Sequence, residues 1–161
     1  MKIGVVSDTH NHMRNVLEIV RLFNEAKVDH VVHTGDITTA KTLELFADLN
    51  APFSGVFGNN DVEIASLKHI AARNEFQFRQ PPLFLNFGAR RVVVVHDPRD
   101  LTETLIQDTD VALHGHTHLL RMERQDGLTI FNPGECAGHM KGLNAVGVIE
   151  LESYQMRLLK F

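Results

Sequence analysis

KIGVVSDTHNHMRNVLEIVRLFNEA, residues 2–26, predicts a buried strand that leads through a polar loop into a helix. Residues 2–7 form a short run rich in β-branched side chains, and after the loop apolar residues recur at helical spacing. The recurring positions are Val16, Leu17, Ile19, Val20 and Phe23. A strand followed by an amphipathic helix is the repeating unit of α/β folds with parallel sheets.

The same unit recurs in the first half of the chain, and the second half has a different pattern. Residues 30–34 and 53–57 are expected to be strands, and residues 40–49 and 63–73 helices. Paired strands then follow around short turns, at residues 83–87 with 91–96, 119–125 with 128–132, and 145–151 with 155–161. A short helical stretch at 101–107 and a strand at 110–114 complete the pattern. The order predicts an α/β fold in one domain that spans residues 1–161.

The composition is that of an ordinary globular protein of 161 residues, 43% hydrophobic and 22% charged. The formal net charge of -4 gives no general attraction to nucleic acid polymers or anionic lipid, both of which favour basic surfaces. Apolar stretches are too short for a membrane helix or a signal peptide, so we expect no membrane partner. Because Cys136 is the only cysteine, no intrachain disulfide can form, and a cytoplasmic location is expected.

Seven potential metal ligands close the predicted strands or follow them: Asp8, His10, Asp36, Asn59, His96, His116 and His118. In extended backbone, residues two apart point the same way, so the pairs in DTH and HTH are each expected to face one cluster. Carboxylate, imidazole and amide groups suit Mn²⁺, Fe²⁺, Ni²⁺, Zn²⁺ or Mg²⁺. Seven ligands exceed one closed tetrahedral site but suit two ions that share a carboxylate, for which Asp36 is expected.

These motifs resemble the calcineurin-like metallophosphoesterase family. The resemblance rests on SDTH at 7–10, GD at 35–36, GNND at 58–61, VVH ending at His96, GHTH at 115–118 and NPGE at 132–135. It covers nearly the whole chain, and the compact length resembles the small single-domain phosphodiesterases of bacteria and archaea. The resemblance implies a four-layer α/β/β/α sandwich of two mixed β-sheets flanked by helices.

The resemblance also implies roles for the ligands. It assigns Asp8, His10 and His118 to a first metal ion, Asn59, His96 and His116 to a second, and Asp36 to both. Asp36, Asn59, Asn60 and His96 are the expected catalytic residues of a dinuclear phosphodiesterase, in which a hydroxide between the metals attacks a small phosphodiester. Mn²⁺ is the first choice of metal. The small proteins that this chain resembles are often dimers or tetramers, so the resemblance implies a homo-oligomer.

Asn60 departs from the family pattern, because many members carry a histidine there that is thought to protonate the leaving oxygen. An amide cannot supply that proton at neutral pH. We therefore expect slow hydrolysis of esters with poor alkoxide leaving groups and efficient hydrolysis of diesters with acidic leaving groups. His12 is an alternative acid, although a solvent-facing residue at a helix entry is the simpler interpretation.

The remaining polar residues have structural interpretations, each weighed against a role in the site. For His33 we favour core packing over support of the site, and Asp61 is expected to bond to a ligand rather than to bind metal. His114 is left out of the site. His30, His69 and His139 are expected to be surface or structural residues, Arg90 and Arg91 a solvated turn, and Cys136 a buried filler.

A second class of function stays open. One branch of the fold that this chain resembles includes the retromer scaffold subunit, which binds proteins and has a weakened metal site. Here every ligand position is filled, including His10 and His96, which favours catalysis. A nuclease or a protein phosphatase ranks lower. The short chain offers no cap domain for DNA, and Asn60 stands where those enzymes generally have a general acid.

Overall fold

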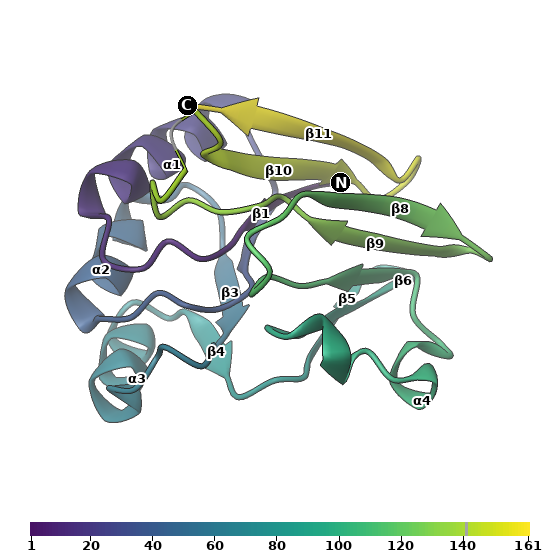
Figure 1. Cartoon of the computed structure of the whole chain (residues 1–161), viewed down its shortest axis with the longest axis horizontal. Helices are drawn as coiled ribbons and strands as arrows, with labels where there is room; N and C mark the ends of the chain where they lie inside the picture. Colours follow the sequence, from purple (N-terminus) through teal and green to yellow (C-terminus); the bar gives the residue numbers. More distant parts are fainter. Residues whose placement is uncertain (141) are drawn as a thin grey trace.

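The computed structural model describes residues 1–140 and 142–161 and contains two β-sheets (Figure 1). Sheet A contains, in spatial order, β11 (Gln155–Lys160), β10 (Ala145–Glu150), β1 (Lys2–Val6), β2 (His30–His33), β3 (Phe53–Val56) and β4 (Gln77–Arg79). Sheet B contains β5 (Leu83–Phe87), β6 (Arg90–Val94), β7 (Val111–Leu113), β9 (Leu128–Asn132) and β8 (Arg121–Gln125). Both sheets are mixed: β1 to β4 run parallel in sheet A, and β6, β7 and β9 run parallel in sheet B.

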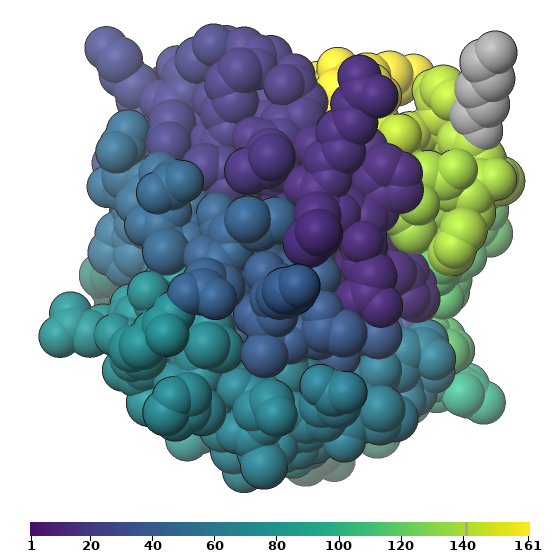
Figure 2. Space-filling model, turned by 90° about the vertical axis from the view of Figure 1, so that its left-hand side faces the viewer, coloured from purple at the N-terminus to yellow at the C-terminus, as the bar shows by residue number. Residues whose placement is uncertain are grey.

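Three helices pack on the outer side of sheet A, and Figure 2 shows the face that they form. They are α1 (Met13–Ala26), α2 (Ala40–Glu44) and α3 (Ile64–Arg73). The apolar stripe of α1 buries Val16, Ile19 and Phe23, as helical spacing predicts, but Leu17 is 53% exposed. The prediction that Leu17 belongs to the buried stripe was therefore wrong. Burial against the sheet stabilises these helices more than their intrinsic propensity does.

A second apolar layer lies between the two sheets. Ile3, Val5 and Val32 from sheet A belong to the same buried cluster as Val94 and Phe131 from sheet B. On the outer side of sheet B, α4 (Glu103–Ile106) lies beside β5 and β6, and a 3₁₀ turn, η2 (Pro98–Asp100), precedes it in the chain. The predicted fold of two mixed sheets with flanking helices is confirmed, with a fourth layer that is much smaller than the first.

Several predicted elements differ in their bounds. The helix predicted at 40–49 divides into α2 and a 3₁₀ turn, η1 (Leu45–Asp48), and the helical stretch at 101–107 is only the four residues of α4. Strand β4 was not predicted, because it has three residues at a sheet edge and its side chains alternate without a buried apolar run. Among the helices of the described residues, none has the length and apolar character needed to cross a membrane.

Candidate metal centre

The predicted ligands lie where five parallel strands end, and both sheets contribute. Asp8 and His10 follow β1, Asp36 follows β2 and Asn59 follows β3, whereas His96 follows β6, and His116 and His118 follow β7. The carboxyl ends of strands are the usual place for ligand sites in α/β sheets. Backbone hydrogen bonds join the loops. The amide of His10 donates to the carbonyl of Asp36 at 2.8 Å, and the amide of Gly115 donates to the carbonyl of His96 at 3.0 Å.

The paired ligands do not reach the cluster through extended backbone, as the spacing had suggested. Asp8 and His10 have φ angles of 50° and 44°, and His116 and His118 have 67° and 57°. All four residues are in the left-handed region of backbone conformation, which residues other than glycine seldom adopt. The strain is of order 1–3 kcal/mol per residue and is typical of functional sites. The pairs do face one cluster, but through two tight, strained loops.

One half of the cluster contains Asp8, His10 and His118, whose ligand atoms lie within 4.8 Å of one another. His118 Nε2 is 3.4 Å from Asp8 Oδ1. Asp8 Oδ1 and His10 Nε2 are both buried without a hydrogen-bond partner among the described residues. Unpartnered buried polar atoms are costly, and each calls for an explanation. A cation between them would provide it.

The other half contains His96, Asn59 and His116. Asn59 Oδ1 lies 3.0 Å from both His96 Nε2 and His116 Nδ1. His96 donates its Nδ1 hydrogen to the carbonyl of Thr34 at 2.9 Å, so Nε2 is free to face the cluster. Asp36 Oδ2 joins the halves, 3.4 Å from His96 Nε2 and 4.0 Å from His10 Nε2. The structure thus brings all seven predicted side chains into one continuous cluster.

Asp36 is held from behind by the GNND loop. Its Oδ1 accepts the backbone amide of Asn60 at 2.9 Å, and its Oδ2 accepts the side-chain amide of Asn60 at 2.7 Å. Asp61 accepts the backbone amides of Asp36 at 3.0 Å, Thr38 at 2.6 Å and Gly58 at 2.7 Å. A Cβ at Gly58 would collide with the Asp36 carboxylate, so glycine is needed there for close approach. Asp61 forms a hydrogen bond with the backbone of the candidate ligand Asp36, as predicted, and Asn60 orients the Asp36 carboxylate.

The donor set and its electrostatics fit divalent cations. Burial raises the pKa of Asp36, but interactions with His96 and Asn60 outweigh it and hold the pKa below its ordinary value. Burial likewise raises the pKa of Asp8, and His118 and Ser7 outweigh it. Both carboxylates are therefore charged at neutral pH. Ligand atoms 2.0–2.2 Å from one tetrahedral ion lie about 3.3–3.6 Å apart. The 3.4 Å separations of Asp8 from His118 and of Asp36 from His96 fall in that range.

His33 links two ligand loops as well as packing in the core. Its ring is completely buried against Phe46 and Phe53. Nδ1 accepts the amide of Gly35 at 3.0 Å, so Nε2 carries the hydrogen and donates to Thr9 Oγ1 at 3.0 Å. The preference for packing alone was therefore incomplete. Burial lowers the pKa of His33 to about 3, which keeps the ring neutral.

The other histidines considered above make structural hydrogen bonds. His12 is the N-cap residue of α1, and its Nδ1 accepts the amide of Asn15 at 3.3 Å, which supports the helix-entry interpretation. His114 is buried and donates to the carbonyl of Gly115 at 3.0 Å. His30 bonds to Ser54 at 2.8 Å, as expected of a structural residue.

Sequence reasoning did not predict that Glu135 and His139 lie beside His118. Their ligand atoms lie within 4.8 Å of one another and of His118, so they extend the cluster at one side. His139 is exposed, as expected of a surface residue, and its ring also stacks on that of His118 with centroids 5.6 Å apart. The available signal was the NPGE motif, from which only the turn was interpreted.

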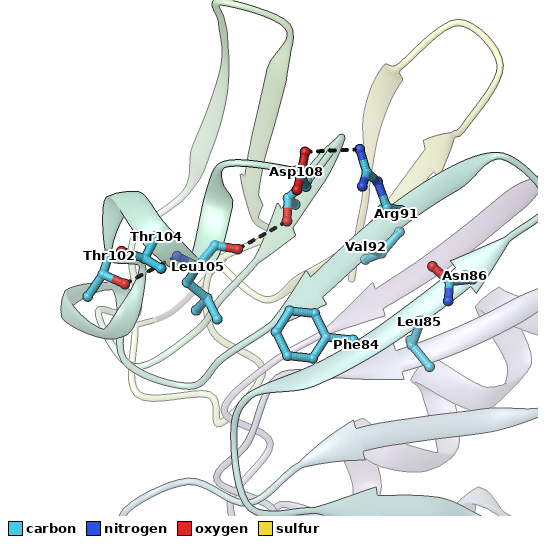
Figure 3. A pocket seen from close by; sticks show the side chains of 10 residues that line it. Phe84, Leu85, Asn86, Arg91, Val92, Thr102, Thr104, Leu105 and Asp108 are labelled. Carbon is cyan, nitrogen blue, oxygen red and sulfur yellow. Dashed lines mark hydrogen bonds and ion pairs between the residues drawn. The ribbon is translucent and has the colours of Figure 1, made fainter.

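Two recesses differ in their relation to the cluster. One adjoins it and is lined by Asn59, His96 and His116 together with Phe57, Pro81 and Arg99. The other lies between α4 and the strands β5 and β6, where Phe84 and Leu105 face each other and Arg91 pairs with Asp108 (Figure 3). None of the residues that line this second recess belongs to the cluster.

Comparison with known proteins assigns the chain to a family. The calcineurin-like phosphoesterase superfamily domain matches residues 1–154. A phosphodiesterase of Methanocaldococcus jannaschii is 32% identical over 98% of this chain and 97% of its own length. The solved structure of an archaeal phosphodiesterase covers 100% of both chains with a TM-score of 0.91 at 31% identity. Vps29 from Entamoeba histolytica, with a TM-score of 0.69 at 19% identity over 100% of this chain and 99% of its own, shares the fold alone. The chain belongs to the calcineurin-like phosphoesterase superfamily.

Proposed function

We propose that this protein is a phosphodiesterase that uses two divalent cations to hydrolyse small diesters with acidic leaving groups. The observation that carries the proposal is the convergence of the seven predicted ligands, with buried, unpartnered atoms on Asp8 and His10. In the proposal Asp8, His10 and His118 hold one cation, Asn59, His96 and His116 the other, and Asp36 both. The relative named as a phosphodiesterase, 32% identical over nearly its full length, supports the diester class.

The chain's own residues prepare the centre. When bound, a pair of divalent cations supplies an activated water and neutralises charge on the phosphoryl oxygens. Asp36 stays ionised because His96 and Asn60 counter its burial. Asn60 fixes both of its carboxylate oxygens. The preformed arrangement means that little reorganisation is needed when substrate binds.

Asn60 also determines the expected leaving group. Its amide donates to Asp36 Oδ2 at 2.7 Å and has no acidic proton to give to a departing alkoxide. Loss of a general acid commonly costs about 10²–10⁴ in rate. An aryl alcohol leaves without that help, so aryl diesters are the expected class. Equal turnover of an aryl phosphodiester and an alkyl phosphomonoester by the purified enzyme would refute this specificity.

The test combines metal reconstitution with matched variants. Metal-free protein is titrated with Mn²⁺, Ni²⁺, Zn²⁺, Fe²⁺ and Mg²⁺ and assayed on phosphomonoesters, aryl diesters and cyclic nucleotides. We expect Mn²⁺ to support the fastest aryl diester hydrolysis, and Asp36→Asn to abolish it without unfolding the protein. Asn60→His restores the family's acid and is expected to raise activity on alkyl esters more than on aryl esters. Hydrolysis that does not depend on added metal would contradict the proposal.

The scaffold alternative has weaker support. The likeness to Vps29 concerns the fold alone, and the full set of ligand side chains favours hydrolysis. A homo-oligomer, manganese as the resident metal and a cytoplasmic location remain predictions. Light scattering of the purified protein and metal analysis of protein from its native cells would test the first two.

A further inference from the structure

Three of the candidate histidine ligands have a second ring nitrogen that faces an oxygen atom outside the cluster. A neutral imidazole that binds a cation through one nitrogen carries its hydrogen on the other, and that hydrogen needs an acceptor. His96 donates its Nδ1 hydrogen to the carbonyl of Thr34 at 2.9 Å. His116 Nε2 lies 3.6 Å from Asp97 Oδ2 on the side away from Asn59. For His118, the second nitrogen faces Glu135.

We propose that Glu135 is a positioning residue for His118. Its carboxylate accepts the Nδ1 hydrogen of His118 and keeps Nε2 free toward Asp8 and the first cation. The proposal rests on the proposed function, because it concerns the affinity of the same metal centre. It gives a role to a residue that no ligand motif includes.

The surroundings of Glu135 require a partner for one of its oxygens. The side chain is completely buried. Oε1 accepts the backbone amide of Met140 at 2.8 Å, whereas Oε2 is buried with no hydrogen-bond partner among the described residues. Oε2 lies 3.6 Å from His118 Nδ1 and 3.4 Å from His139 Nδ1. A shift of a few tenths of an ångström brings His118 Nδ1 to about 3.2 Å, the outer limit of an ordinary hydrogen bond.

The NPGE turn holds Glu135 in register with both ligand loops. The side-chain amide of Asn132 donates to the carbonyl of Gly115 at 3.3 Å and to Thr117 Oγ1 at 3.1 Å, and its oxygen accepts the amide of Gly134 at 2.9 Å. On the other side, the amide of Cys136 donates to the carbonyl of Asp8 at 3.3 Å. The turn is thus tied to the loop that carries His118 and to the loop that carries Asp8.

His139 covers the outer side of this pair. Its ring is stacked on that of His118 with an interplanar angle of 8°, and 60% of its side chain is exposed. The three ligand atoms of His118, Glu135 and His139 are close enough to hold a cation of their own. That ion would bind His118 through Nδ1 while the first ion binds Nε2, so the ring would have to lose both hydrogens. The positioning role needs no such step.

Metal affinity separates these interpretations. Glu135→Gln keeps the volume but offers only one acceptor, so an amide hydrogen must face either Met140 or His118. Calorimetric titration of metal-free protein with Mn²⁺ is expected to show two ions in the wild type and a 10- to 100-fold weaker affinity for one of them in E135Q. His139→Phe is the matched control, since it keeps the stacked ring and is expected to change affinity by less than about twofold.

The outcomes are distinct. Unchanged affinity in E135Q overturns the proposal. A third ion in the wild type that both E135Q and H139F lose also overturns it, because the cluster is then a separate metal site. Hydrolysis is assayed separately at saturating Mn²⁺. Cation binding without any phosphodiester hydrolysis refutes the proposed function, while the affinities still decide the role of Glu135.

A measurement on the wild type covers the case in which E135Q does not fold. Nitrogen-15 NMR of histidine-labelled protein, metal-free and loaded with diamagnetic Mg²⁺, reports the tautomer of His118. We expect the hydrogen on Nδ1. A neutral His118 ring that carries its hydrogen on Nε2 and none on Nδ1 overturns the proposal.

Discussion

Replacing His33 with phenylalanine tests how two ligand loops are held together. The histidine accepts the buried amide of Gly35 and donates to Thr9, each at 3.0 Å. Phenylalanine keeps a ring against Phe46 and Phe53 but leaves both polar groups without a partner. Leaving a buried polar group unpartnered costs about 1–3 kcal/mol. For the two groups together, we expect the free energy of unfolding to fall by about 2–4 kcal/mol near pH 7.5.

The cost of this substitution should depend on pH. Burial lowers the pKa of His33 from 6.5 to about 3, so below pH 6.5 the unfolded chain binds a proton that the folded protein does not. The stabilising contribution is complete above the unfolded pKa and is lost as pH falls toward the folded value. Wild-type stability therefore falls by about 1.4 kcal/mol per pH unit in this window. Phenylalanine has no such proton, so its cost should be smaller by about 2 kcal/mol at pH 5.

The assay is urea unfolding of metal-free wild type and H33F at pH 7.5 and 5.0. Other titrating groups are present in both proteins and cancel in the difference when they are independent of position 33. Exposed His69 on α3 offers a matched control, and His69→Phe should change stability by less than about 0.5 kcal/mol at either pH. An H33F cost that is the same at both pH values would refute the reasoning.

Three further predictions concern the metal centre. Gly58→Ala places a methyl group against the Asp36 carboxylate and should weaken Mn²⁺ affinity at least tenfold in a calorimetric titration; an unchanged affinity would show that the loop yields. Asp61→Asn turns an amide toward one of three backbone N–H groups and should destabilise the protein by about 1–3 kcal/mol in urea, whereas a neutral result would contradict the geometry. Removing metal with EDTA should lower the melting temperature and excess Mn²⁺ should restore it, since ligand at 100 times its Kd adds about 2.7 kcal/mol per site; a melting temperature that ignores metal would count against the centre.

The fold and the composition of the cluster could be predicted because both depend on short-range patterns. A strand such as residues 2–7 and the helix after it are visible in apolar spacing, and polar residues at strand ends meet because parallel strands share a direction. The left-handed loops could not be predicted, since φ at Asp8 and His116 is imposed by contacts with other loops. The intrinsic backbone preference of these residues favours negative φ, and tertiary contacts outweigh that preference.

Glu135 illustrates a different limit. A single acidic residue after a turn carries no periodic signal, and its importance arises from burial and from the side chains that surround it. His33 is similar, because its two hydrogen bonds reach loops that are close in space only after the sheet has formed. Strand β4 was missed because three residues at an edge contain too little pattern to distinguish them from a loop.

The candidate metal centre is divided between the two sheets, and this division has a mechanical consequence. The gap between Asp36 and His96 is set by how sheet A rests on sheet B, and therefore by the fit of side chains such as Phe131 against Gly147. A substitution deep in that interface would change the distance between the ligands of the two sheets without altering any ligand. A loss of activity in such a variant would come from misaligned ligands, because every ligand side chain would still be present. Conversely, ions that bridge the seam would clamp the two halves of the protein together.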